Sequence, residues 1–141
     1  MTFELKAVSP AGLSFVSLCE GHEKDLFSRA TQNDRDGDFP LMNMADFIKS
    51  GVMRATVPAE PGGLGVVMMR DHIAGMTRLG RGDGSTAIAT NMHLYRTWMA
   101  ARVWRAARIT GETAREAVVA AVLRDVASGN RTPAADLHRE G

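Results

Sequence analysis

The chain of 141 residues is poor in cysteine, in aromatic side chains and in net charge. Its single cysteine, Cys19, cannot form an intramolecular disulfide, which suits a reducing compartment such as the cytoplasm. Aromatic residues make up only 6% of the chain and the formal net charge is +1, so neither a stacking surface nor an electrostatic attraction for nucleic acid is expected. These shortages exclude a disulfide scaffold and argue against a nucleic-acid partner.

Long apolar runs are missing as well. No segment approaches the ~20 consecutive apolar residues of a transmembrane helix, and the N-terminus has neither the basic start nor the apolar core of a signal peptide. The hydrophobic fraction of 45% and the charged fraction of 23% are those of an ordinary globular protein, and 141 residues fit a single domain. We therefore expect one cytoplasmic globular domain without a membrane segment.

Apolar residues recur with helical periodicity along most of the chain, and no segment alternates convincingly with the period of a strand. This pattern predicts an all-α fold, a helical bundle with no substantial sheet. We expect five helices, at residues 13–32, 43–50, 67–79, 85–108 and 112–128. The segment 57–65 holds two prolines and three glycines and cannot be helical.

Three of the expected helices carry an apolar stripe, which in a globular protein normally faces the core. In the first helix the stripe is formed by Leu13, Val16, Cys19 or Glu20, Phe27 and Ala30. In the longest helix it is formed by Ile88, Met92, Tyr95, Met99 and Val103. In the last helix the residues expected to point inward are Ala114, Val118, Val122 and Val126.

Turn-forming and capping residues mark the expected helix boundaries. Residues 32–38 should break the first helix, Asn43 should cap the second, and Gly51 should end it. Asp83 or Ser85 can cap the longest helix, whose last turns hold arginines that favour the negative end of the helix dipole. Binding of a phosphate is the other use for these arginines, Arg102, Arg105 and Arg108.

Two segments imitate metal-binding motifs without completing them. Residues 34–38 resemble the start of a calcium loop, but Phe39 and Ala45 stand where an EF-hand needs its glycine and its bidentate glutamate. His22 and Glu23 resemble a zinc-protease helix, but Leu26 occupies the place of the second histidine. No ligand spacing relates the remaining histidines, and we predict no metal site; they are His72, His93 and His138.

Catalytic residues cannot be assembled from the sequence. The glycine-rich segments 62–65 and 80–84 follow no strand and match no nucleotide-binding fingerprint, so tight turns explain them better than phosphate binding. No nucleophile lies at a spacing that pairs it with a base. Taken by themselves, the residues indicate a helical domain with no catalytic residue of its own.

The order of the turns nevertheless resembles one family, the acyl-CoA dehydrogenases. Their opening domain has an acidic-basic turn before Phe-Pro, then a Pro-acidic-x-Gly-Gly-x-Gly loop, then an Asp-x-Ser-Thr helix start. The matching segments here are Asp34-Arg35, Phe39-Pro40, 50–53, 57–65, 79–87 and Asn91-Met92-His93. The resemblance covers roughly residues 13 to 129 in the right order, with one departure at Pro61, where the family often carries an aromatic residue.

The resemblance implies both an activity and a division of the chain. Residues 1–129 would be the helical N-terminal domain of a FAD-dependent acyl-CoA dehydrogenase, an oxidoreductase that introduces an α,β double bond into an acyl-CoA thioester. The polar tail 130–141 would be the start of a missing middle domain. Family members continue into a β-barrel-like domain and a second helical domain, which hold most of the FAD contacts and usually the catalytic glutamate. We therefore expect this chain to be inactive alone and not to bind FAD tightly.

Truncation has a consequence for partners. A bundle that normally packs on further domains should expose an apolar face, so self-association or binding to a partner chain is expected. The face between the loop 62–65 and the helix that begins at Ser85 should be the most exposed. An expressed fragment, a truncated gene and one chain of a multi-chain enzyme all fit this description.

Three residues of the longest helix match family positions that face the acyl tail, and they form our predicted substrate-binding site. They are Ala89, Thr90 and His93, which share one side of a helix. His93 would be an unusual lining for a plain fatty-acyl tube, which favours a polar, branched or ring-bearing acyl group. The alternative is that His93 only hydrogen-bonds to a neighbouring helix or to water.

Two further functions fit the same sequence. Similar opening domains occur in flavin monooxygenases and nitroalkane oxidases, so a related monooxygenase is one alternative. The other is a helical interaction module that stands alone and has kept the bundle but lost catalysis.

Overall fold

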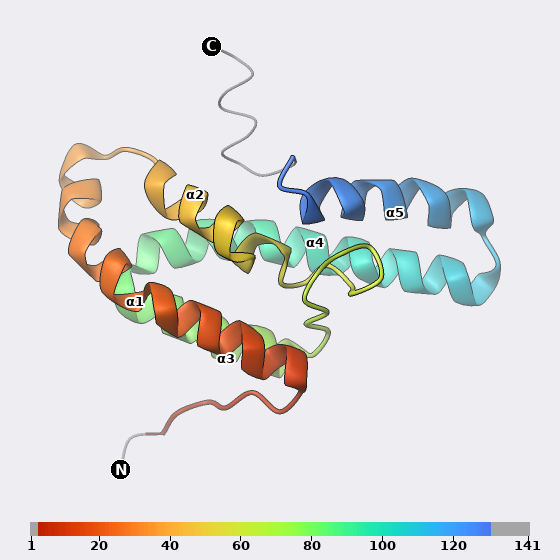
Figure 1. Cartoon of the computed structure of the whole chain (residues 1–141), viewed down its shortest axis with the longest axis horizontal. Coiled ribbons are helices and arrows are strands. Elements are labelled where there is room, and N and C mark those ends of the chain that lie inside the picture. Colours follow the sequence, from red (N-terminus) through yellow and green to blue (C-terminus); the bar gives the residue numbers. More distant parts are fainter. Residues whose placement is uncertain (1–2, 131–141) are drawn as a thin grey trace.

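The structure is a computed structural model that describes residues 3–130 (Figure 1). Within these residues it contains helices and no strand, so the all-α prediction is confirmed. The expected tail lies outside the described residues apart from Asn130. The elements are α1 (Pro10–Asp36), α2 (Leu41–Ser50), the short 3-10 helix η1 (Val52–Arg54), α3 (Met69–Gly82), α4 (Gly84–Thr110) and α5 (Thr113–Ala127).

Helix α1 continues one turn past its expected end. The side-chain amide of Gln32 donates to both carboxylate oxygens of Asp36, at 2.8 and 2.7 Å, and this i,i+4 contact supports a last turn made of turn-forming residues. Gly37 then ends the helix in the left-handed region, with φ 66°. Most of the segment that imitates a calcium loop is thus the final turn of a helix.

Helix α2 begins earlier than expected. It starts at Leu41, directly after Pro40, whose ring holds the chain in a conformation from which a helix can begin. The prediction that Asn43 caps this helix is therefore wrong: Asn43 lies inside α2 and is buried. Its amide is instead used in a tertiary contact with α4.

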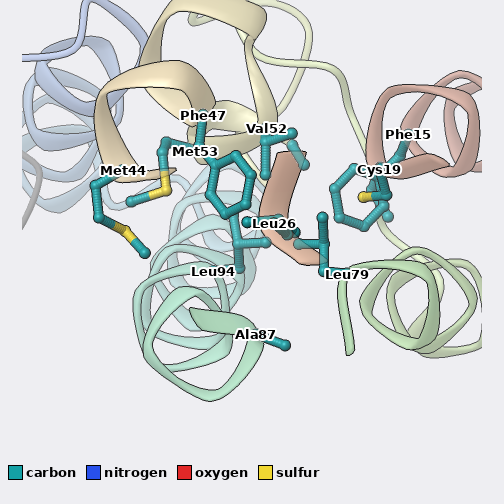
Figure 2. Packing of buried hydrophobic residues seen from close by; sticks show 12 residues of the cluster. Phe15, Cys19, Leu26, Met44, Phe47, Val52, Met53, Leu79, Ala87 and Leu94 are labelled. Atoms are coloured by element: carbon teal, nitrogen blue, oxygen red, sulfur yellow. The ribbon is translucent and has the colours of Figure 1, made fainter. Parts of the chain in front are cut away.

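Helices α1 and α3 pack along each other and form one end of the molecule, while α2 and η1 lie over α4 (Figure 1). The contact between α1 and α3 is close, because a Cβ atom on Gly75 would lie 2.3 Å from the ring of Phe15. Figure 2 shows the main core between these elements. It is formed by Phe15, Cys19, Leu26, Met44, Phe47, Val52, Met53, Ala55, Val66, Leu79, Ala87 and Leu94.

The loop before α3 turns tightly, as its glycines predict. A Cβ on Gly63 would lie only 2.0 Å from the carbonyl oxygen of Val57, so a larger residue has no room there. Gly62 and Gly65 have φ values of 109° and 77°, which disfavour other L-residues. The loop brings Val57 and Val66 into the interior and leads the chain to α3.

Helices α4 and α5 form a hairpin that extends beyond the rest of the bundle (Figure 1). Its buried cluster is small and consists of Val57, Trp104, Leu123 and Val126. No helix within residues 3–130 is both long and apolar enough to cross a membrane.

Most residues of the predicted apolar stripes do not face the core, although Cys19 of α1 is fully buried as predicted. All five stripe residues of α4 are 40–70% exposed. Leu13 and Phe27 of α1 and Val118 of α5 are exposed as well, at 56%, 72% and 66%. Ala114 is exposed as well, whereas Val126 is buried as predicted. The buried face of α4 carries small and polar residues in their place: Thr86, Ala87, Thr90, Leu94, Thr97, Ala101, Trp104 and Ala107.

Threonine can occupy this buried face because its hydroxyl finds a partner on its own helix. Thr90 donates to the carbonyl of Thr86 at 2.8 Å, and Thr97 donates to the carbonyl of His93 at 3.0 Å. With the polar atom satisfied, each threonine packs like a small β-branched apolar residue. The periodicity of strongly apolar residues therefore pointed to the exposed face of α4 and not to the face that is buried.

Candidate functional site

The first turn of α4 is held by a chain of polar side chains. Asp83 caps the helix by accepting from the backbone N–H of Ser85 at 3.1 Å, and it also accepts from the hydroxyl of Thr86. Thr86 in turn accepts from the side-chain amide of Asn43 at 2.9 Å. Arg29 donates to the Asn43 carbonyl oxygen at 3.0 Å, so the chain of contacts links α1, α2 and α4.

The three predicted substrate-binding residues lie on the side of α4 that faces the other elements. Ala89 is partly buried against the main core, and Thr90 is fully buried. His93 is partly buried, and its Nε2 atom lies 2.9 Å from the carbonyl oxygen of Met53 in η1. Thr90 and His93 thus each have a partner within the domain, while a role in lining a substrate cavity stays a prediction.

Burial favours the neutral form of the His93 ring. Because a carbonyl oxygen only accepts, Nε2 must carry the proton. Burial lowers the pKa of His93 below its ordinary value, although the hydrogen bond to Met53 opposes the change, and the nearby Arg96 charge lowers it further. The ring therefore donates one hydrogen bond and keeps Nδ1 as an acceptor.

A second hydrogen bond runs in the opposite direction between the same two regions. The Thr56 hydroxyl donates to the carbonyl oxygen of Leu94 at 2.8 Å. Together with the His93 contact it ties η1 and the residues after it to the middle of α4. The position of Met53 is fixed in this way.

Met53 borders a cavity of about 210 Å³ between α2, η1 and the end of α5. The cavity is smaller than the roughly 300–1,000 Å³ usual for a ligand pocket, so these residues do not enclose a flavin by themselves. None of the three predicted substrate-binding residues lines it. Its lining is formed by Ile48, Lys49, Met53, Arg54, Val126, Ala127, Ser128 and Gly129.

The cations of this cavity, Lys49 and Arg54, were not identified by sequence reasoning. They lie in two short elements, and only tertiary packing brings these next to the end of α5, more than 70 residues further along the chain. No motif spacing connects such positions. Sequence reasoning on a single chain therefore had no signal for this cavity.

The remaining reactive groups have structural partners. Cys19 is fully buried, and this burial raises the pKa of its thiol far above the ordinary value, which keeps it unreactive. The His22 ring lies 2.8 Å from the Ser50 hydroxyl. Among the described residues, no group of three or more His, Cys, Asp or Glu side chains is arranged to hold a metal ion.

Comparison with known families identifies this architecture. Residues 19–130 match the family model for the acyl-CoA dehydrogenase N-terminal domain. The helical bundle, the glycine-rich loop before α3 and the Asp-capped α4 are the parts that the sequence resemblance had pointed to. The chain therefore belongs to the acyl-CoA dehydrogenase family, through its N-terminal domain.

Among the curated proteins to which this chain is similar are nitrososynthases. L-evernosamine nitrososynthase from a Micromonospora species is 40% identical over 89 residues, which cover 63% of this chain and 21% of that protein. The solved nitrososynthase from Micromonospora carbonacea var. africana is 35% identical with a TM-score of 0.80, and the match covers 91% of this chain and 32% of that one.

A second solved structure contains a flavin and a sugar nucleotide. KijD3, in complex with FMN and dTDP-3-amino-2,3,6-trideoxy-4-keto-3-methyl-D-glucose, is 35% identical with a TM-score of 0.80. The match covers 88% of this chain and 30% of KijD3. The matched part thus amounts to a third or less of each of these relatives.

Proposed function

We propose that this chain is the N-terminal helical domain of a flavin-dependent oxidoreductase that acts on the amino group of a nucleotide-linked sugar, and not on an acyl-CoA thioester. The observation that carries the proposal is the similarity to nitrososynthases, at 35% identity over about nine-tenths of the chain. This makes the related flavin monooxygenase, which was an alternative at first, the favoured function.

A nitrososynthase converts an amino group into a nitroso group. In this conversion the amino group gains one oxygen atom and loses two hydrogen atoms. A flavin supplies this redox chemistry when it is bound, and the protein supplies position and shielding from water. We assign the described residues a supporting part: they orient α4 through the Asp83 cap and the His93 contact. Tight flavin binding, whether of the FAD expected at first or of the FMN seen in KijD3, should require the rest of the enzyme.

A cytoplasmic location is part of the same proposal. Cys19 is the only cysteine of the chain, is buried and forms no disulfide, which suits a reducing compartment. Nucleotide sugars and flavin nucleotides carry charged phosphates and do not cross a membrane passively. An enzyme that uses them is therefore expected in the compartment where they are made.

The test starts from the DNA on both sides of the 141 codons. A flavin-binding reading frame there would encode the rest of the enzyme. The complete enzyme is then supplied with reduced flavin, oxygen and a dTDP-linked amino sugar, or in parallel with an acyl-CoA and an artificial electron acceptor. We expect a sugar product that has gained one oxygen and lost two hydrogens, and no reduction of the acceptor by acyl-CoA.

Two other outcomes would reject the proposal. Oxidation of acyl-CoA without any change to the amino sugar would indicate that the complete enzyme is an acyl-CoA dehydrogenase. Unrelated DNA on both sides, together with no activity after mixing with flavin, would favour the interaction module that stands alone.

A further inference from the structure

The cavity between α2, η1 and the end of α5 is positively charged. Lys49 belongs to the last turn of α2 and Arg54 is the last residue of η1, so two separate elements bring a cation to the same cavity of about 210 Å³. None of the described residues that line it is acidic, and the other six are uncharged: Ile48, Met53, Val126, Ala127, Ser128 and Gly129. The sign of the charge therefore favours an anion as the ligand.

Both cations lack a partner inside the domain. Across residues 3–130, the ammonium group of Lys49 and the guanidinium group of Arg54 form no ion pair and no side-chain hydrogen bond. By contrast, Arg29 of α1 is paired with Asp46 at 2.7 Å. Since neither cation of the cavity has to give up a protein partner, both are free to donate hydrogen bonds to a bound anion.

The two helix ends beside the cavity are capped without these cations. The carbonyl oxygens in the last turn of α5 accept the backbone N–H groups of residues 128–130, at 2.9–3.1 Å. At the end of α2, the Gly51 N–H donates to the carbonyl oxygen of Phe47 at 3.1 Å. A cation near a helix C-terminus still interacts favourably with the helix dipole. That interaction is the competing role of Lys49 and Arg54, and it predicts an effect on stability instead of on ligand binding.

Two glycines allow the walls of the cavity to approach each other. A Cβ atom on Gly51 would lie 3.1 Å from Nε of Arg54, so its absence leaves room for the Arg54 side chain beside the end of α2. A Cβ atom on Gly129 would lie 3.1 Å from a methyl group of Ile48, so the end of α5 packs closely on α2. Both glycines have a positive φ, 99° and 82°, which other L-residues rarely adopt. Backbone geometry therefore holds Arg54 beside the helix that carries Lys49.

The size of the cavity and its two cations suit a diphosphate group. Arginine donates two parallel hydrogen bonds to phosphate oxygens, whereas lysine acts as a compact point charge, and both are usual in phosphate sites. A cavity of about 210 Å³ is smaller than the roughly 300–1,000 Å³ of a site for a whole ligand. It therefore fits one charged group of a larger molecule better than the entire molecule.

We propose that Lys49 and Arg54 form an anion site that binds the diphosphate group of a nucleotide-containing ligand. The identity of that ligand rests on the proposed function, since the solved relative KijD3 is in complex with a dTDP-linked amino sugar and a flavin nucleotide. A diphosphate has two chemical sources in such an enzyme, a sugar nucleotide and a flavin adenine dinucleotide. Binding of inorganic pyrophosphate tests the site itself, and the two nucleotides then identify the source.

The experiment uses the 141-residue chain, with inorganic pyrophosphate as the probe and inorganic phosphate as the smaller reference anion. Isothermal titration calorimetry at low ionic strength should show saturable binding of pyrophosphate and roughly tenfold weaker binding of phosphate, which reaches fewer donors. Added sodium chloride should weaken the binding of both anions, because it screens the charges.

Titrations with dTDP and with FAD distinguish the two sources. We expect dTDP to bind at least as tightly as pyrophosphate and FAD to bind more weakly than dTDP. The reverse order would identify the flavin dinucleotide as the ligand. Either order supports the diphosphate site, because both molecules present the same charged group.

Variants connect the binding to the two cations. Lys49→Ala and Arg54→Ala should each weaken pyrophosphate binding roughly tenfold or more, and the double variant should abolish it. Arg54→Lys keeps the charge without the two parallel donors and should weaken binding less than Arg54→Ala does. Lys24→Ala is the matched control, because Lys24 is exposed on α1 and lies outside the cavity. Urea unfolding of each variant measures the competing effect on the helix ends.

Three results would overturn the proposal. Absence of saturable pyrophosphate binding at low salt would remove the site, and a loss of affinity in Lys24→Ala as large as in Lys49→Ala would reduce it to a nonspecific attraction. A double variant that binds pyrophosphate as the wild type does, but unfolds at a lower urea concentration, would assign the cations to the helix ends. Turnover of a dTDP-linked amino sugar by the complete enzyme is measured separately, so failure of that assay rejects the proposed function and leaves the anion site standing.

Discussion

The two ends of the bundle differ in the size of the buried core that stabilises them. The end formed by α1, α2, α3 and the start of α4 encloses a core of twelve residues (Figure 2), whereas the hairpin of α4 and α5 encloses a cluster of four. The hairpin also contains a buried indole N–H, that of Trp104, which has no hydrogen-bond acceptor among the described residues. One end thus encloses a full core, whereas the other is held together by a much smaller buried cluster.

The α1–α3 end gains further order from one buried carboxylate. Asp71 accepts from the backbone N–H of Val8 at 2.8 Å and from the backbone N–H of Ser9 at 3.2 Å, and its carboxylate also accepts from the Ser9 hydroxyl. Ser9 is the N-cap of α1, so a residue of α3 fixes the place where α1 begins. In the hairpin, the ion pair between Arg108 of α4 and Glu116 of α5 is partly exposed instead. These two features predict where substitutions will cost most.

The largest effect should come from the main core. Phe47→Ala removes a fully buried ring and leaves a cavity, and we expect it to cost about 3–5 kcal/mol of unfolding free energy. Urea unfolding followed by circular dichroism measures it. Phe27→Ala, at a ring that is 72% exposed, should change the stability by no more than about 0.5 kcal/mol. Similar costs for the two variants would contradict the buried core.

Asp71→Ala should have the next largest effect, about 2–3 kcal/mol, because it leaves the donors of Val8 and Ser9 without an acceptor. Asp71→Asn keeps one acceptor oxygen and should cost less. Both are measured by thermal and urea unfolding at neutral pH. An Ala variant as stable as the wild type would show that solvent replaces the carboxylate.

Asp71 also makes stability depend on acid. Burial raises the pKa of its carboxyl, but the hydrogen bonds from Ser9 and Val8 outweigh this and leave the pKa below the ordinary value of 3.8. The unfolded chain therefore binds the proton more readily, and the stabilisation is present above about pH 4 and lost as the pH falls through the folded-state pKa. In Asp71→Asn the stability should fall less steeply below pH 4.

In the hairpin, Leu123→Ala should cost about 2 kcal/mol, at the low end for a buried leucine, since a thin cluster can close over the cavity. Hydrogen exchange gives an independent measurement: amides of α5 should exchange faster than those of α3. If Leu123→Ala lowers the unfolding free energy as much as Phe47→Ala does, the hairpin cluster is as stabilising as the main core, contrary to our expectation.

The smallest effect concerns the contact between the two ends. His93→Gln should cost about 1 kcal/mol at neutral pH by weakening the hydrogen bond to Met53. Because burial lowers the pKa of His93 below 6.5 in the folded state, the unfolded chain gains protons first as the pH falls. The stability contributed by the neutral ring is thus complete above the unfolded pKa and decreases below it.

Unfolding free energies measured between pH 7 and pH 5 test this sign. The wild type should lose stability over this range and the His93→Gln variant should lose less. His22, whose pKa is also lowered by burial, should preserve part of the dependence in the variant. If the variant loses as much unfolding free energy between pH 7 and pH 5 as the wild type, the pH dependence comes from His22 and not from His93.

The helices and their order followed from local rules and could be predicted. Gly51 ends α2 with a positive φ and Asp83 caps α4, as predicted, each through contacts within a few residues of the chain. The end of α1 at Gly37 lies one turn beyond the expected end. The tight loop at Gly63 was likewise predictable, because the missing Cβ is a property of the residue itself. Membership of the family followed from the spacing of these same turns.

Which face of α4 is buried was decided by the tertiary structure. Both faces carry residues at helical spacing, and local pattern favoured the strongly apolar one, whereas the bundle buries the threonines and alanines. Likewise, the contact of Asn43 with Thr86 and the cavity beside Lys49 join positions far apart in the chain. Local sequence determines where a helix forms because its hydrogen bonds join residues four apart, but the side it turns inward depends on the other surfaces present.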